Sequence, residues 1–228
     1  MMRTVSLLAA LTLTAEGAAT LKGLLIRNEI GGAPVAGVAV GADGANPTTS
    51  TQFGAFTLDF PNRKPGERVK LTVAKDGMVV VNWVQLDALL PADPGGANIL
   101  TLIVAREAER EEMARRFFRL RSYAEIEANY KRLLEEGKQD RARLLKERDA
   151  ATAAASRAAE DLAKVQPGQS SELYETAVRL LAEGKSEEAI RARDEAKLRE
   201  QRQAARERKE QAEKQLAEAT QAWRLKGQ

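Results

Sequence analysis

The chain has 228 residues, with 36 Lys and Arg against 33 Asp and Glu, so its length allows one or two small domains and its formal net charge is only +3. It contains neither Cys nor His. This excludes a disulfide, a thiol nucleophile, an imidazole-based catalytic triad and a Cys/His zinc site. The basic residues are interspersed with acidic ones, which favours a solvated helical surface over a nucleic-acid partner.

Composition divides the chain near residue 105. Residues 1–105 hold 12 of the 16 Gly and 6 of the 7 Pro, but only 8 of the 36 basic and 8 of the 33 acidic residues. Gly and Pro are the strongest markers of turns, whereas mixed charge without such markers is typical of solvated helices. The sequence therefore predicts a turn-rich β domain followed by a helical region.

The first 19 residues have the pattern of a secretory signal peptide. Arg3 precedes an apolar run over residues 5–15, which is too short to span a bilayer. Small residues then allow cleavage after Gly17 or after Ala19. The alternative is an ordinary first strand or a core helix. A signal peptide predicts a periplasmic or secreted protein, with which the absence of Cys agrees, and no later segment is long and apolar enough to be an integral membrane segment.

At least six short strands are predicted between residues 21 and 104. Apolar and polar residues alternate over 56–60 and 69–73, which is the period of a half-buried strand. The run 78–86 is apolar on both faces except for Asn82 and Gln85, and we expect it to be a central strand. The other strands are expected at 24–28, 38–42 and 99–104. Turn residues separate all of them, so residues 20–105 predict a small antiparallel β-sandwich.

An ordered set of residues in this region resembles the carboxypeptidase regulatory-like domain, a transthyretin-like (prealbumin-like) sandwich. The set is Gly23, Pro34-Val35-Ala36-Gly37-Val38, Val40, Ser50, Gly54, Phe56, Leu58, Gly66, Val69, Leu71, Val73 and Gly77. The chain departs from the family at Thr51 and Met78, where members often have Asp and an aromatic residue. The resemblance covers residues 21–90 and implies an accessory module of exported proteins without peptidase activity.

Two aromatic residues of the β region need an interpretation. Phe53 lies in a predicted hairpin turn, where polar residues are usual. It is either an exposed contact for a partner or a side chain folded back over the sandwich edge. Trp83 is expected in the core.

Residues 106–166 predict a helical spacer. A first helix over 107–120 places Met113, Phe117 and Leu120 on one face, which could pack against an open face of the sandwich. Ser122 and Glu125 fit a capping box and predict a new helix from residue 123. A heptad seam then runs through Leu144, Arg148, Ala151, Ala155, Ala158, Leu162 and Val165. This pattern predicts a coiled coil or helical hairpin, and an intramolecular hairpin and a homodimer both satisfy it.

Residues 167–228 predict a helix pair and a long charged helix. Pro167-Gly168 ends the preceding helix and Ser170 or Ser171 caps the next. The stretch 173–190 resembles one tetratricopeptide repeat, through Ala177, Leu180, Gly184, Ala189 and Ile190. A single repeat needs neighbours to bury its face. Residues 194–226 are expected as a solvated helix against the helix over 123–165, with a weak apolar stripe that ends at Trp223.

Together these features predict an α+β chain: a signal peptide (1–19), a β-sandwich (20–105), a helical spacer (106–166) and a tetratricopeptide-like pair with a long helix (167–228). No phosphate-binding loop or calcium loop is present. We therefore expect a non-enzymatic exported scaffold that binds a protein or peptide partner, with no catalytic, cofactor or metal residues. The alternative is a structural stalk that forms a homo-oligomer through its coiled-coil helices. The arrangement resembles exported bacterial tetratricopeptide-repeat proteins.

Overall fold

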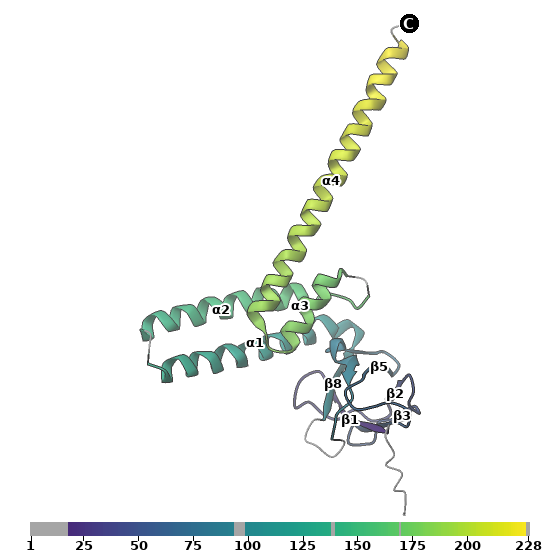
Figure 1. Ribbon diagram of the computed structural model, residues 1–228, viewed down its shortest axis with the longest axis vertical. Helices are drawn as coiled ribbons and strands as arrows, with labels where there is room; N and C mark the ends of the chain where they lie inside the picture. Colours follow the sequence, from purple (N-terminus) through teal and green to yellow (C-terminus); the bar gives the residue numbers. More distant parts are fainter. Residues whose placement is uncertain (1–17, 94–98, 138–139, 169, 227–228) are drawn as a thin grey trace, which may run out of the picture. The chain divides into compact units, whose positions relative to one another are not determined.

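The computed structural model describes residues 18–93, 99–137, 140–168 and 170–226, with side chains to residue 218. The predicted signal peptide, up to residue 17, lies outside this part. The described chain is α+β: two four-stranded sheets precede four α-helices (Figure 1). It divides into two compact units, of which the first contains most of residues 18–104 and the second residues 28–30, 81–84 and 105–226.

The first unit contains both sheets. One sheet has the order β4-β1-β8-β6 and the other the order β3-β2-β5-β7. The strands are β1 (Ala19–Arg27), β2 (Ala39–Ala42), β3 (Thr48–Thr49), β4 (Ala55–Phe60), β5 (Arg68–Ala74), β6 (Met78–Val80), β7 (Asp87–Leu89) and β8 (Leu100–Arg106). Each predicted strand overlaps one of these strands at least in part, and β3 and β7 are additional.

Two features of the sheets differ from the prediction. β1 and β8 are parallel, from Gly23 opposite Leu100 to Arg27 opposite Val104, so a wholly antiparallel arrangement is wrong at this pair. The predicted central strand 78–86 is also wrong. β6 ends at Val80 and lies at a sheet edge, and a 3-10 helix (Trp83–Leu86) follows. Asn82 is buried at 2% exposure in this run, and a buried amide has to find hydrogen-bond partners that a regular ladder does not provide. Trp83 is half-buried.

The two sheets share one hydrophobic core. It includes Leu25, Phe56, Phe60 and Leu102 from the first sheet and Val40, Val69 and Leu71 from the second. Each fully buried side chain of this size contributes about 1.5–3 kcal/mol. Gly23 lies opposite Phe56 in the ladder, and a Cβ at Gly23 would be 2.1 Å from Phe56 Cζ. Glycine at this position therefore leaves the space that the Phe56 ring occupies.

Ser50 closes the loop that precedes β4. Its buried Oγ donates to the Val35 carbonyl at 2.8 Å and accepts from the Val38 N–H at 3.0 Å. A buried hydroxyl with both bonds made stabilises the loop at little desolvation cost.

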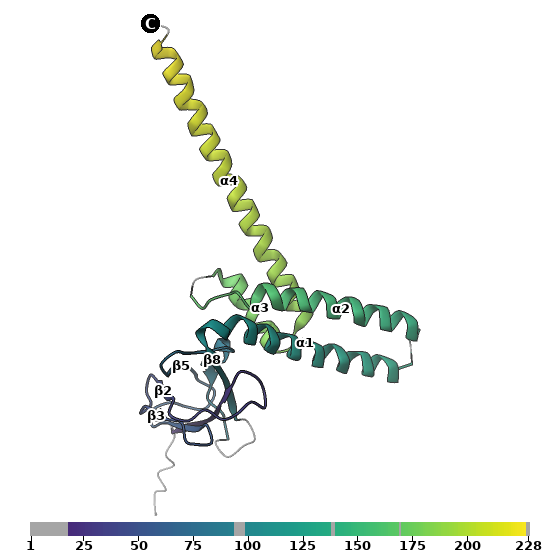
Figure 2. The same cartoon turned by 180° about the vertical axis from the view of Figure 1, so that it is seen from behind.

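The second unit contains the helices. These are α1 (Arg110–Glu135), α2 (Arg141–Leu162), α3 (Glu172–Ala182) and α4 (Ser186–Lys226). α1 and α2 lie side by side as a hairpin, which Figures 1 and 2 show from opposite sides. Tyr123 Oη and Ser156 Oγ join them at 2.6 Å, and Arg119 pairs with Glu160. Five of the seven residues of the predicted heptad seam are buried in this unit: Leu144, Ala155, Ala158, Leu162 and Val165. Arg148 and Ala151 are only half-buried.

The predicted helix start at residue 123 is wrong, because α1 continues through Ser122 without a break. Ser122 is fully buried, and its Oγ has no hydrogen-bond partner among the described residues. No Gly or Pro interrupts residues 106–136, so the local capping signal has nothing to terminate the preceding helix. Met113, Phe117 and Phe118 are buried, whereas Leu120 is 51% exposed and does not belong to the buried face.

The predicted helix pair after Pro167 is present as α3 and α4. Ala177 and Ala189 are completely buried between neighbouring helices, and Gly184 turns the chain with a φ of 85°. Only the first part of α4 contacts α2, where Lys197 Nζ lies 2.6 Å from Asp161 Oδ2. From Gln201 to Glu218 almost every side chain is exposed. The expectation that this helix lies along α2 thus holds only near its start, and the Trp223 side chain lies outside the described residues.

Candidate binding groove

Phe53 is exposed in the turn before β4. Its side chain is 69% exposed, so the interpretation in which it folds back over the sheet edge is wrong. The turn is held by the Thr51 side chain, whose Oγ1 accepts from the Phe53 N–H at 3.3 Å, and by a 2.8 Å bond from the Gly54 N–H to the Thr51 carbonyl. A single exposed aromatic residue is normal on a protein surface. Its role as a partner contact stays a prediction.

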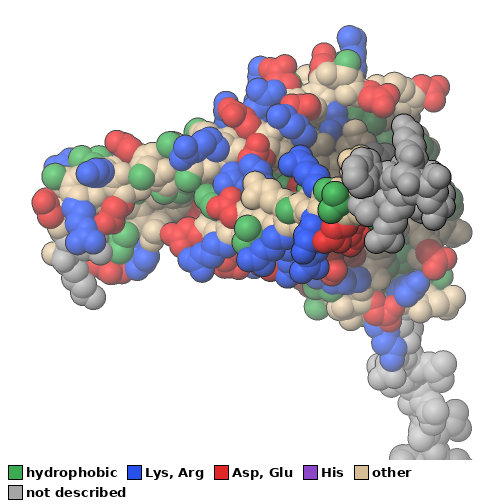
Figure 3. All heavy atoms as spheres, turned by 90° about the horizontal axis from the view of Figure 1, so that it is seen from above, with side chains coloured by type: hydrophobic (Ala, Val, Ile, Leu, Met, Phe, Trp, Pro, Cys, Tyr) green, Lys and Arg blue, Asp and Glu red, His purple; other side chains and the backbone are tan. Residues whose placement is uncertain are grey.

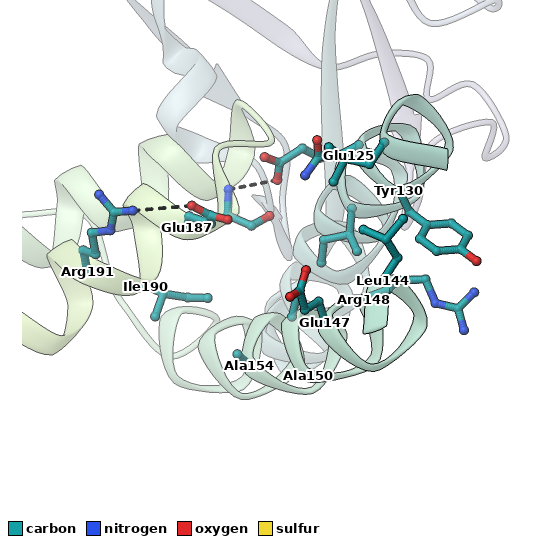
Figure 4. A pocket seen from close by; sticks show the side chains of 15 residues that line it. Glu125, Tyr130, Leu144, Glu147, Arg148, Ala150, Ala154, Glu187, Ile190 and Arg191 are labelled. Carbon is teal, nitrogen blue, oxygen red and sulfur yellow. Dashed lines mark hydrogen bonds and ion pairs between the residues drawn. The ribbon is translucent and has the colours of Figure 1, made fainter. Parts of the chain in front are cut away.

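A more developed site lies in the helical unit. α1, α2 and the start of α4 enclose a groove of about 510 Å³ (Figure 4). Its volume lies in the range of ligand and peptide sites, about 300–1,000 Å³. Apolar side chains from all three helices line it: Ile126 and Leu133 from α1, Leu144, Ala151 and Ala154 from α2, and Ile190 from α4. The groove therefore offers a surface for another apolar side chain or helix face.

Two polar contacts hold the end of α3 and the start of α4 on α1. Glu125 accepts a hydrogen bond from the Ser186 N–H at 3.0 Å, and Arg121 Nε donates to the Ala182 carbonyl at 3.0 Å. A carboxylate at a helix N-terminus satisfies a free N–H group and interacts favourably with the helix dipole. Glu125 thus caps α4 rather than its own helix, where the sequence pattern had placed its bond.

Most charges at the rim of the groove are already paired. Glu147 accepts from Arg143 Nε at 2.8 Å, and Glu187 pairs with Arg191 at 3.4 Å. Arg148 bonds to Asp149 at 2.8 Å and lies 5.2 Å from the centre of the Tyr130 ring, in a cation–π contact. The hydrogen bond to Asp149 raises the pKa of Arg148 further above its ordinary value. Figure 4 shows Tyr130 and Arg148 side by side, away from the paired Glu187 and Arg191.

Two polar groups of the groove remain without such partners in the described part of the chain. The Glu125 carboxylate, on an exposed residue, has no ion pair, although it accepts the Ser186 N–H. The Ser186 side chain lines the groove, is only 3% exposed, and its Oγ has no hydrogen-bond partner. An unsatisfied buried hydroxyl costs about 1–3 kcal/mol, so this end of the groove is the place where a ligand group would gain most.

A second hollow, of about 350 Å³, lies between the end of α2, the start of α3 and α4. Its side chains bind one another. Tyr174 donates to Glu200 at 3.1 Å, while Lys197 and Arg193 both pair with Asp161. Burial, followed by the bond to Glu200, raises the pKa of Tyr174. This network ties α4 to α2 and α3.

Other chemistry is sparse in the described ranges. No group of three or more Asp, Glu, Cys or His side chains there could hold a metal ion. None of the helices in this part of the chain combines the length and the apolar composition that a membrane span needs.

Comparisons with protein-family models, with curated proteins and with solved structures found no significant match. The geometry of the groove is therefore the evidence for function. The sequence indicated that Ile126, Leu144 and Ile190 are apolar positions of helices. It did not indicate that they leave a shared surface open, because that depends on how three helices meet.

Proposed function

We propose that this chain is a non-enzymatic exported scaffold that binds a protein partner through the groove between α1, α2 and α4. The observation that carries the proposal is an open apolar surface contributed by three helices, with a paired charged rim around it. Helix-in-groove recognition uses such a surface, with anchors at positions i, i+3, i+4 and i+7 of the bound helix.

The two resemblances are part of this proposal. The shared core of the two sheets and the contacts of Gly23 and Ser50 support a carboxypeptidase regulatory-like sandwich. The buried Ala177 and Ala189 and the turn at Gly184 support a tetratricopeptide-like helix pair. In such an arrangement the sandwich acts as an accessory module and the helices provide the binding surface. The signal-peptide pattern of residues 1–19 supports export to the periplasm or the medium.

The test is selection of peptide ligands on the whole chain. A displayed library of amphipathic helical peptides is enriched on the protein, and the binders are then measured on two α4 variants. Ile190→Asp places a charge in the groove, whereas Leu198→Asp changes a residue that is 45% exposed on the same helix outside it. We expect Ile190→Asp to abolish binding and Leu198→Asp to preserve it. Binders that are insensitive to Ile190→Asp, or no binders at all, would contradict the proposal.

A second candidate is a structural stalk that self-associates through α4. The exposed stretch from Gln201 to Glu218 carries a weak apolar stripe that includes Ala205, Ala212 and Leu216. Five of the seven residues of the predicted seam through α2, in contrast, are already buried within the chain. Sedimentation of the chain from Ala18 onward separates the two candidates. A dimer that Ala212→Glu dissociates supports the stalk, and a stable monomer contradicts it.

A further inference from the structure

One charge at the polar end of the groove has no ion-pair partner among the residues that the structure describes. Five charged residues line the groove, and Glu147, Arg148, Glu187 and Arg191 each have an ion-pair partner. Glu125 has none among the described residues. Its bond to the Ser186 N–H uses Oε2 and leaves Oε1 as an acceptor. A cation supplied by the ligand is the group that would complement this carboxylate.

The Ser186 hydroxyl is a second and independent indication that a ligand donor binds at this end of the groove. It is nine-tenths buried, lines the same groove and has no hydrogen-bond partner. The first residue of α4 is also where Glu125 binds, so the hydroxyl and the carboxylate belong to one end of the groove. A primary ammonium or guanidinium group has several N–H donors, so one such group can serve more than one oxygen acceptor.

The anionic alternative is less favourable. The N-terminus of a helix attracts anions, but at α4 this position already holds the Glu125 carboxylate. A second anion there would lie next to Glu125 and Glu187, and repulsion between like charges opposes its binding.

We infer that the groove takes an amphipathic helix whose apolar face fills the space between α1, α2 and α4 and whose Lys or Arg pairs with Glu125 and donates to Ser186 Oγ. The inference rests on the proposed function and names the chemistry of the partner. Apolar anchors supply the affinity, and the basic residue selects and orients the helix.

The test uses the same display selection on the whole chain, with one position flanking the apolar face varied among Lys, Arg, Gln and Glu. We expect the enriched peptides to carry Lys or Arg at that position. Replacing it by Gln should weaken binding about fivefold, as for a partly exposed ion pair, and replacing it by Glu should weaken binding further.

Matched variants of the protein test whether Glu125 and Ser186 are the residues that bind the basic side chain. Glu125→Gln keeps an acceptor for the Ser186 N–H and removes the charge, so binding should fall about fivefold. The lost interaction of the carboxylate with the α4 dipole should lower thermal stability only slightly. Glu135→Gln, on an exposed carboxylate of α1 outside the groove, is its control. Ser186→Ala should weaken binding of the basic peptides without lowering stability, since its hydroxyl makes no hydrogen bond to any described residue. Ser122→Ala removes another buried hydroxyl without a partner, away from the groove, and should leave affinity unchanged.

The outcomes separate the two levels of the argument. Peptides that do not respond to Ile190→Asp overturn the proposed function and the inference together. Peptides that require the groove but show no preference for Lys or Arg, or that are insensitive to Glu125→Gln, overturn the inference alone. A loss of stability in Ser186→Ala would show that the hydroxyl has a structural role and would also overturn its assignment to the ligand.

Discussion

Substitution of Gly54 by Ala gives a quantitative test of the turn that presents Phe53. Gly54 has a φ of 72°, and a Cβ there would lie 2.3 Å from the Leu25 carbonyl oxygen and 3.1 Å from Pro34 Cβ. A left-handed conformation costs an L-residue about 1–2 kcal/mol. The contact with a backbone oxygen must also be relieved by a shift of the turn. That shift weakens the bonds from Leu25 N–H to Gly54 O (2.8 Å) and from Val35 N–H to Leu25 O (2.9 Å), at about 0.5–1.5 kcal/mol each.

Gly66→Ala is the matched control for this substitution. Gly66 has a φ of 86°, but a Cβ there would meet no atom within 4 Å. Part of its conformational cost is offset by the lower entropy of the unfolded chain, about 0.4–1 kcal/mol. We expect Gly66→Ala to destabilise the β unit by about 1 kcal/mol and Gly54→Ala by about 3 kcal/mol.

Native-state hydrogen exchange of the β1 amides is the appropriate measurement, because it reports the opening of the β unit separately from that of the helices. The difference between the two variants in the free energy of opening gives the cost of the contact with the Leu25 carbonyl. If Gly54→Ala cost no more than Gly66→Ala, the close approach between the turn and β1 described above would be incorrect.

Three further predictions address the helical unit and the N-terminus. Ala158→Leu overfills a fully buried position of α2 and should lower the free energy of unfolding by about 1–3 kcal/mol, whereas Ala153→Leu, on the exposed face, should change it by less than about 0.5 kcal/mol. Thermal unfolding followed by circular dichroism compares the two variants, and equal effects would refute the packing of Ala158. Because the pKa of Tyr174 is raised in the folded state, the unfolded chain loses the Tyr174 proton first, and stability should fall as the pH rises above about 10. Urea titrations should show a smaller loss of stability over this pH range for Tyr174→Phe, and an equal loss would contradict the prediction. For the exported protein, mass spectrometry should find cleavage after Gly17 rather than after Ala19, because Ala19 is 3% exposed and belongs to β1, where it pairs with Phe60 of β4. A product that begins at Thr20 or retains Met1 would contradict this prediction.

The strands could be predicted where a period of two is bounded by turn residues. Residues 56–60 and 69–73 lie within β4 and β5 because alternation and flanking Gly or Pro specify both the strand and its ends. The parallel pairing of β1 with β8 could not be predicted, since it joins segments that are far apart in sequence. The error at residues 78–86 has another cause: an apolar run does not distinguish a buried strand from a buried turn.

The groove between α1, α2 and α4 could not be predicted from the sequence for a related reason. Ser122 and Glu125 have the spacing of a capping box, but spacing describes only what neighbours in sequence can do. In the folded chain Ser122 is buried within a continuous helix, and Glu125 caps α4, 61 residues further along. The groove is the space that remains where three helices meet, and no local pattern encodes such a space.

The charge pattern of the helices indicates where specificity can reside. Many basic residues pair with an acidic residue four positions away, so that their charges are neutralised along each helix. Examples are Arg116 with Glu112, Arg132 with Glu136, Arg143 with Glu147 and Arg199 with Glu195. The space-filling view shows basic and acidic side chains interspersed over the visible surface (Figure 3). A surface of this kind produces little long-range field, and it does not select a partner by net charge. Selection then depends on the few groups that the helices do not pair among themselves, and at the groove these are the Glu125 carboxylate and the Ser186 hydroxyl.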